Sequence, residues 1–201
     1  MKPRILVAGI GNIFLGDDAF GCEVAQRLAA RTLPENIRVV DYGIRGYDLA
    51  YALMDDYTAA ILVDATSRGE RPGTLYTLEI DTTAMRSGSG DPHGMDPVHV
   101  LAMVRAMGGK PPRIYLVGCE PGETEERMGL SEPVQAALDG AAEMVESLIH
   151  RIEKGAEYEQ PSESGLHHGG GGGGHRDLTG HPALHPHQHD VIISTGGKTC
   201  V

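Results

Sequence analysis

Residues 59–64 read Ala-Ala-Ile-Leu-Val-Asp, an apolar run that ends in a carboxylate. A strand whose hydrophobicity is unbroken is typical of the centre of a parallel sheet, where both faces are buried. Parallel strands need helical crossovers, which cover the two faces of the sheet. This stretch therefore predicts an α/β fold with residues 59–63 as a central strand, and it places Asp64 at that strand's end.

Strand and helix signals alternate along the rest of the chain up to residue 154. Short apolar runs predict strands at 5–8, 37–40, 74–80 and 114–117. Apolar residues spaced by three or four predict helices at 18–31, at 47–54, after the N-cap pair Asp96-Pro97, and from the N-cap Ser131 to Ile152.

The connection between the third and fourth strands decides the sheet's topology. Residues 65–73 are too few for a crossover helix, so the strand at 74–80 is expected to run antiparallel to the others. The predicted fold class is α/β, a three-layer α/β/α sandwich around a five-stranded, mostly parallel sheet with one antiparallel strand.

The composition separates a domain from a tail. Of the 28 glycines and 10 histidines, 11 and 7 respectively lie from residue 155 onward, in a low-complexity stretch. We expect an α/β domain at 1–154 and a flexible Gly/His-rich tail at 155–201.

Charge and cysteine usage exclude several classes of protein. The net charge is -11 without a clustered basic face, which argues against nucleic acid or a membrane surface as partner. The apolar start of the chain runs into Asn12 without a small-residue cleavage site, so we expect a buried first strand here and not a signal peptide. Three cysteines far apart fit reduced thiols, and a cytoplasmic location is expected.

The loop after the first strand argues against a nucleotide cofactor. Phe14 stands where a dinucleotide fingerprint needs glycine. Asp17 and Asp18 stand where a phosphate-binding loop has Lys and Ser or Thr, and they would repel a phosphate. Helix capping explains one carboxylate, but two exceed what one cap needs, so one of them is expected to face the cleft.

Asp18, Asp64 and His93 follow predicted strands at the same edge of the sheet, where ligands of such folds gather. Each alone has an ordinary interpretation, as a cap, an acceptor for loop amides or an exposed imidazole. Together they suit a first-row divalent metal with a position left open for water or substrate. His99 is ranked below His93 because it lies inside a predicted helix. Cys119, a conceivable nucleophile, fits a small buried thiol better.

Several motifs, taken in order, identify a family. They are Gly9-Ile-Gly11-Asn12, Gly16-Asp17-Asp18-Ala-Phe-Gly21, Asp41-Tyr-Gly43-Ile-Arg-Gly46, Val63-Asp64-Ala65, Pro72-Gly73-Thr74, Pro92-His93, Gly118-Cys119-Glu120-Pro121 and Gly129-Leu130-Ser131. In this order, over about residues 4–150, they resemble the hydrogenase maturation protease family.

The resemblance implies an endopeptidase that removes the C-terminal extension of a [NiFe] hydrogenase large-subunit precursor after nickel insertion. The family's metal-contacting acid, Asp and His match Asp18, Asp64 and His93 here. These residues would engage the nickel of the substrate, and either the metal or a carboxylate would activate the attacking water. A monomer without a nucleotide cofactor is expected.

The histidine-rich tail supports an alternative, a nickel-binding chaperone or storage protein without proteolysis. Deletion of residues 160–201 separates the two hypotheses. A protease would keep cleaving, whereas a storage protein would lose most of its bound nickel.

Overall fold

The computed structural model of the protein describes residues 2–82 and 97–155. The strands are β1 (Ile5–Ile10), β2 (Ile37–Gly43), β3 (Ala59–Ala65), β4 (Leu75–Ile80) and β5 (Arg113–Cys119). A short 3-10 turn, η1 (Gly16–Ala19), leads into α1 (Phe20–Ala29), and the later helices are α2 (Gly46–Ala52), α3 (Pro97–Ala106) and α4 (Glu132–Glu153).

The five strands form one sheet in the order β2-β1-β3-β5-β4. β1 pairs in parallel with β2 and β3, and β3 pairs in parallel with β5. β4 pairs antiparallel with β5, as the short connection before it predicted. The strand at 59–63 therefore lies in the centre of the sheet, and the predicted fold class is confirmed.

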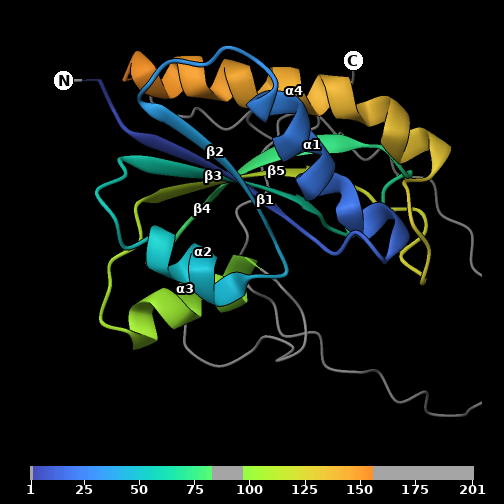
Figure 1. The fold of residues 1–201 in the computed structure, drawn as a ribbon, viewed down its shortest axis with the longest axis horizontal. Coiled ribbons are helices and arrows are strands. Elements are labelled where there is room, and N and C mark those ends of the chain that lie inside the picture. Colours follow the sequence, from blue (N-terminus) through green and yellow to red (C-terminus); the bar gives the residue numbers. More distant parts are fainter. Residues whose placement is uncertain (1, 83–96, 156–201) are drawn as a thin grey trace, which may run out of the picture.

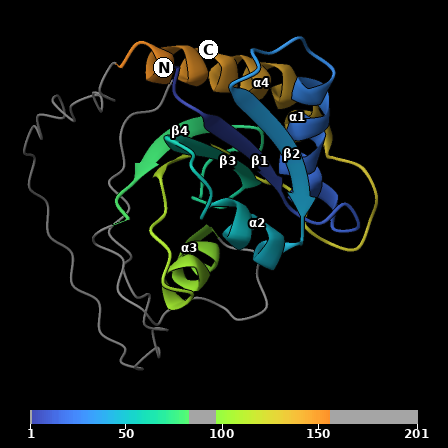
Figure 2. The same cartoon turned by 60° about the vertical axis from the view of Figure 1, so that its left-hand side comes forward.

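Helices cover both faces of the sheet, so the molecule has three layers (Figures 1 and 2). α1 and α4 pack on one face, and α2 and α3 pack on the other. Along β3, Ile61 and Val63 face the first pair of helices, while Ala60 and Leu62 face the second. This burial on both sides explains why the run at 59–63 contains no polar residue.

The helix predicted from Asp18 begins differently in the structure. Asp18 lies in η1, where its N–H donates to Leu15 O at 3.1 Å, and α1 starts only after this turn. The neighbouring Asp17 N–H donates to Glu123 O at 2.7 Å. The turn is thus tied to a loop far along the chain, which the local helical spacing does not reveal.

Four strands, β1, β2, β3 and β5, are longer than the predicted runs, and two of these extensions bear on the site. β2 continues past Val40 to Gly43. β3 continues to Ala65, because the ladder with β5 extends to the pair Ala65 and Cys119. Asp64 therefore lies inside the last part of β3, not after it.

Among the described helices, none combines the length and the apolar character that crossing a membrane would need. α4 ends at Glu153, next to the predicted domain boundary. The predicted tail lies, apart from Gly155, outside the described residues and stays a prediction.

Candidate active site

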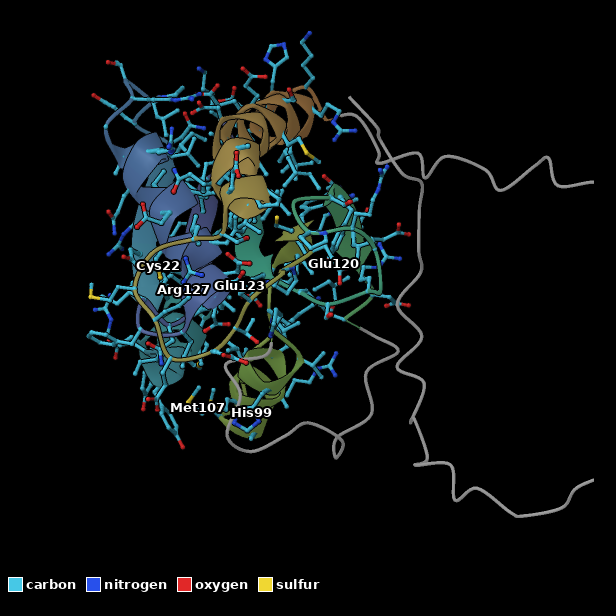
Figure 3. The ribbon with its side chains drawn as sticks, turned by 90° about the vertical axis from the view of Figure 1, so that its right-hand side faces the viewer. Cys22, His99, Met107, Glu120, Glu123 and Arg127 are labelled. Atoms are coloured by element: carbon cyan, nitrogen blue, oxygen red, sulfur yellow. The ribbon has the colours of Figure 1, made fainter. Side chains whose placement is uncertain are left out.

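The carboxyl ends of β1, β2, β3 and β5 share one edge of the sheet, and the loops that follow them meet there. Arg127 N–H donates to Phe14 O at 3.0 Å, and Gly11 N–H donates to Gly43 O at 3.2 Å. The loop after β1 is thus joined both to the loop after β5 and to the last residue of β2. Figure 3 shows the loop that carries Glu123 and Arg127 crossing in front of α1, with Cys22 beside it.

Two glycines allow α1 to lie directly against the sheet at this edge. A Cβ on Gly21 would lie 2.1 Å from Val63 O and 2.3 Å from Ile10 O. A Cβ on Gly9 would lie 2.3 Å from Gly21 O. This close approach of backbones holds η1, and with it Asp18, near the end of β3.

Asp18 accepts one hydrogen bond from the part of the chain that the structure describes. It is half-buried, and its Oδ2 accepts a hydrogen bond from Asn12 N–H at 2.7 Å. Burial raises the pKa of Asp18, and the hydrogen bond from Asn12 opposes this only in part. A carboxylate whose pKa is raised at the mouth of a sheet is suited to proton transfer.

Asp64 lies on the face of the sheet that α2 and α3 cover, and only 7% of it is exposed. The Cys22 thiol lies near both Asp64 and Asp18. This thiol donates to Gly11 O at 3.4 Å, and burial together with the nearby Asp41, Asp18 and Asp64 carboxylates raises the pKa of Cys22 to about 12. Both predicted carboxylates therefore lie within electrostatic reach of one buried thiol, so the structure brings Asp18 and Asp64 into one neighbourhood.

A tyrosine forms the wall beside Asp64. Tyr76 on β4 is paired with Gly118 on β5, and a Cβ at Gly118 would lie 2.2 Å from Tyr76 Cζ. The ring thus occupies the space that the glycine leaves, one strand away from Asp64. Burial is the main reason that the pKa of Tyr76 is raised to about 12, and the charge of Asp64 contributes. The phenol stays protonated and donates to Thr66 O at 2.9 Å.

Asp17, the other carboxylate of η1, is fully buried and has a structural role. Its Oδ2 accepts from Gly122 N–H, Glu123 N–H and Ser131 Oγ–H at 2.7 to 2.8 Å, and its Oδ1 accepts from Ser131 N–H at 2.6 Å. Burial alone would raise the pKa of Asp17, but these hydrogen bonds outweigh it and lower the pKa. Of the two adjacent carboxylates, Asp17 is the one engaged by structural hydrogen bonds, and the place of Asp18 in the site stays a prediction.

Ser131 precedes α4, as predicted, but its side chain does not cap the helix. No hydrogen bond joins its hydroxyl to the first turn of α4. The hydroxyl donates to Asp17 instead. The expected side-chain cap is thus wrong: the hydroxyl is turned toward the buried Asp17 carboxylate, to which it donates, and its oxygen accepts no N–H of the first turn.

Glu120 is a second buried carboxylate that the sequence did not single out for a structural role. Its oxygens accept from Ser67 Oγ–H at 3.0 Å, Arg68 N–H at 2.7 Å and Gly69 N–H at 3.2 Å. Burial favours a higher pKa for Glu120, yet the hydrogen bonds prevail and the pKa is lowered. Glu120 thereby fastens the loop after β3. Its position in Cys119-Glu120-Pro121 was the one signal in the sequence.

His93 lies outside the described residues, and so does the expected N-cap Asp96. Within residues 2–82 and 97–155, no three His, Cys, Asp or Glu side chains are grouped so that they could hold a metal ion. His99 lies in α3, as predicted, and Figure 3 labels it on that helix, below the edge that carries Glu123 and Arg127. The set of Asp18, Asp64 and His93 stays a prediction.

Cys119 is a buried thiol, as predicted. It is fully buried at the end of β5. Burial, together with the nearby charge of Asp17, raises the pKa of Cys119 to about 12. A thiol that stays protonated at neutral pH is a poor nucleophile.

Exposed apolar side chains gather on the same edge as the two carboxylates. They belong to the loops after β1, β2 and β5 or to the first turn of α2, and they are between 41% and 71% exposed. We call this set the apolar rim; it consists of Ile13, Phe14, Ile44, Tyr47 and Met128. Groups of exposed apolar residues are typical of surfaces that bind other proteins.

Comparison with known proteins connects this arrangement to one family. A family model described as hydrogenase maturation protease matches residues 22–148. The chain belongs to the hydrogenase maturation protease family. The hydrogenase 2 maturation protease of Escherichia coli is 34% identical over 145 residues, which are 71% of this chain and 88% of that protein.

Solved structures of hydrogenase maturation proteases have the same fold. The hydrogenase maturating endopeptidase HybD from Escherichia coli has a TM-score of 0.64 and 32% identity, covering 74% of this chain and 93% of that one. The hydrogenase 2 maturation peptidase from a Thaumarchaeota archaeon has a TM-score of 0.58 and 29% identity, covering 73% and 98%. The protein is thus a peptidase of the hydrogenase maturation protease family.

Proposed function

We propose that this hydrogenase maturation protease removes the C-terminal extension from the large-subunit precursor of a [NiFe] hydrogenase after nickel has been inserted. Asp18, Asp64 and His93 contact the nickel that the precursor carries, so that only loaded precursor is cleaved. The observation that supports this most is the placement of Asp18 and Asp64 within reach of one thiol at the carboxyl edge of the sheet.

The chemistry is hydrolysis of one peptide bond. A water attacks the carbonyl carbon, its proton is taken up at the site, and a proton is delivered to the leaving nitrogen. The half-buried Asp18 carboxylate, whose pKa is raised, is a proton acceptor at the site alongside the second carboxylate, Asp64. Nickel of the precursor would act as a Lewis acid on the same water or on the carbonyl oxygen.

The apolar rim supports a protein as the substrate. Part of it adjoins Asp18, since Asn12, whose N–H donates to the Asp18 carboxylate, directly precedes Ile13 and Phe14. A folded precursor can bury these side chains while its extension reaches the two carboxylates.

Incubation with nickel-loaded and nickel-free large-subunit precursor tests the proposal, with cleavage scored by mobility shift. The wild-type protein should cleave only the loaded form. Asp18→Asn, Asp64→Asn and His93→Ala should leave precursor unprocessed while remaining folded by circular dichroism.

Normal processing by any of these three variants would remove that residue from the site. Cleavage of nickel-free precursor at the wild-type rate would overturn the nickel requirement.

The histidine-rich tail supplies the second hypothesis, nickel storage. A variant lacking residues 160–201 should still process loaded precursor if the protein acts as a protease. Loss of processing together with most of the bound nickel would favour storage or delivery instead.

A further inference from the structure

Thr66 is a residue for which neither the fold nor the family match provides a role. Its hydroxyl oxygen is buried. Among the buried side-chain nitrogen and oxygen atoms of the described residues, it is the one without a hydrogen-bond partner. Buried polar groups are nearly always hydrogen-bonded, so an exception needs an explanation. Valine has nearly the same shape and would avoid the cost of burying an unpaired hydroxyl.

The main chain of Thr66 is held in place from two sides. Its N–H donates to Cys119 O at 3.0 Å, which continues the ladder between β3 and β5 by one residue. Its carbonyl accepts the Tyr76 hydroxyl at 2.9 Å. The arginine Arg68 stacks on the Tyr76 ring at 4.7 Å from its centroid, which supports the tyrosine from outside. The unpaired hydroxyl is therefore on a rigid part of the backbone.

β3 ends at Ala65, but the bond from Thr66 N–H to Cys119 O continues its ladder by one residue, and side chains two apart in such extended backbone lie on the same face. Asp64 and Tyr76 both belong to the face covered by α2 and α3. We therefore infer that the Thr66 hydroxyl lies on the same side of the chain as the Asp64 carboxylate and near the Tyr76 ring, whose hydroxyl bonds the Thr66 carbonyl.

We propose that Thr66 is a positioning residue for the Asp64 carboxylate in the substrate-bound state. When Asp64 turns toward the nickel of the precursor, the Thr66 hydroxyl donates a hydrogen bond to the carboxylate oxygen that faces away from the metal and fixes its orientation. The hydroxyl is left unpaired in the free protein because its acceptor reaches it only in the complex. This role rests on the proposed function of the site.

The test compares Thr66→Val with Thr66→Ser in the full chain, using nickel-loaded precursor. Loss of a hydrogen bond to a metal-contacting carboxylate typically costs about tenfold to a hundredfold in activity. We expect Thr66→Val to lower kcat by about that factor with KM little changed, and Thr66→Ser to restore most of it. Thr66→Val should keep or raise Tm, because no hydrogen bond of the free protein is lost.

Thr77→Val is the matched control. Thr77 is also a buried threonine, but its neighbour Tyr76 on β4 faces the site, so Thr77 faces the opposite side of the sheet. This control should process precursor at the wild-type rate. Wild-type kcat in Thr66→Val, or a lowered Tm with kcat reduced equally in Thr66→Ser, would overturn the positioning role. Failure of the wild-type protein itself to cleave loaded precursor would instead refute the proposed function.

Discussion

Asp17 and Asp18 are adjacent carboxylates that differ in what surrounds them. Asp17 accepts four hydrogen bonds from residues more than a hundred positions away, whereas Asp18 accepts the bond of Asn12. Asp17→Asn replaces one acceptor oxygen by a donor that faces other donors. We expect it to lower the free energy of unfolding by roughly 2–4 kcal/mol, measured by urea denaturation.

Asp18→Asn is the control for that change. Burial of its charge works against the fold, as the raised pKa indicates, so neutralising it should leave the free energy of unfolding unchanged or slightly higher. Processing of precursor should nevertheless be lost. Equal destabilisation by both variants would contradict the division of roles between the two carboxylates.

Glu120 gives the fold a dependence on pH. Its pKa is lowered in the folded protein, so the ionised form contributes stability above the ordinary value of 4.5, and this contribution is lost as pH falls through the lower folded-state pKa. Glu120→Gln should be less stable than wild type at pH 7, and the difference in Tm should shrink below about pH 4.5. A difference that stays constant down to pH 3 would show that the charge is not what fastens the loop.

At the scale of elements, contact between α1 and the sheet depends on Gly21. Its absent side chain lets the helix backbone approach Ile10 and Val63, and any Cβ would collide with backbone oxygens. Gly21→Ala must push α1 outward. We expect it to lower the free energy of unfolding by about 1–3 kcal/mol and to reduce processing, because η1 and Asp18 move with the helix.

Gly140→Ala is the matched control within α4. A Cβ there meets only Leu75 Cδ1 at 3.3 Å, the flexible end of a side chain. The gain in helix propensity of up to about 1 kcal/mol should offset this contact, so Tm should stay the same or rise. If both variants destabilise the protein equally, close packing of α1 is not the cause.

The elements show which features could be predicted from the sequence. The order of strands and helices followed from apolar runs and spacing, and the antiparallel β4 followed from a connection too short for a helix. Asp64 was predicted at the correct edge of the sheet. The extension of β3 past Asp64 was missed, because pairing with β5 leaves no signal within residues 59–65.

The partners of Asp17 could not be predicted for a related reason. A buried acceptor for Ser131 and Glu123 leaves no periodic pattern, since its donors lie in another loop that the fold brings close. The same holds for Thr66, whose significance depends on an unpaired atom and not on its neighbours in sequence.

At the scale of the whole molecule, the apolar rim should bind the precursor. The double variant Phe14→Glu/Met128→Glu places charges on two side chains that are 60% and 71% exposed, on loops joined through Arg127. We expect KM for loaded precursor to rise about tenfold or more, since a desolvated charge in an interface core is costly, while kcat and Tm change little.

Met54→Glu is the control, because Met54 is also exposed but packs against Gly109 at the other end of α2. It should leave KM unchanged. An increase of KM in Met54→Glu as large as in the double variant would show a general effect of charge, not a docking surface.

Because of the four hydrogen bonds of Asp17, amide exchange just before α4 depends on whether the turn η1, which carries Asp17 and Asp18, stays closed. The amide hydrogens of Gly122, Glu123 and Ser131 end on one carboxylate, and the turn that carries it also carries Asp18. Opening of that turn would release all three amides at once. Hydrogen exchange at these amides, followed with and without precursor, would therefore record how often the loop detaches and whether bound substrate holds it closed.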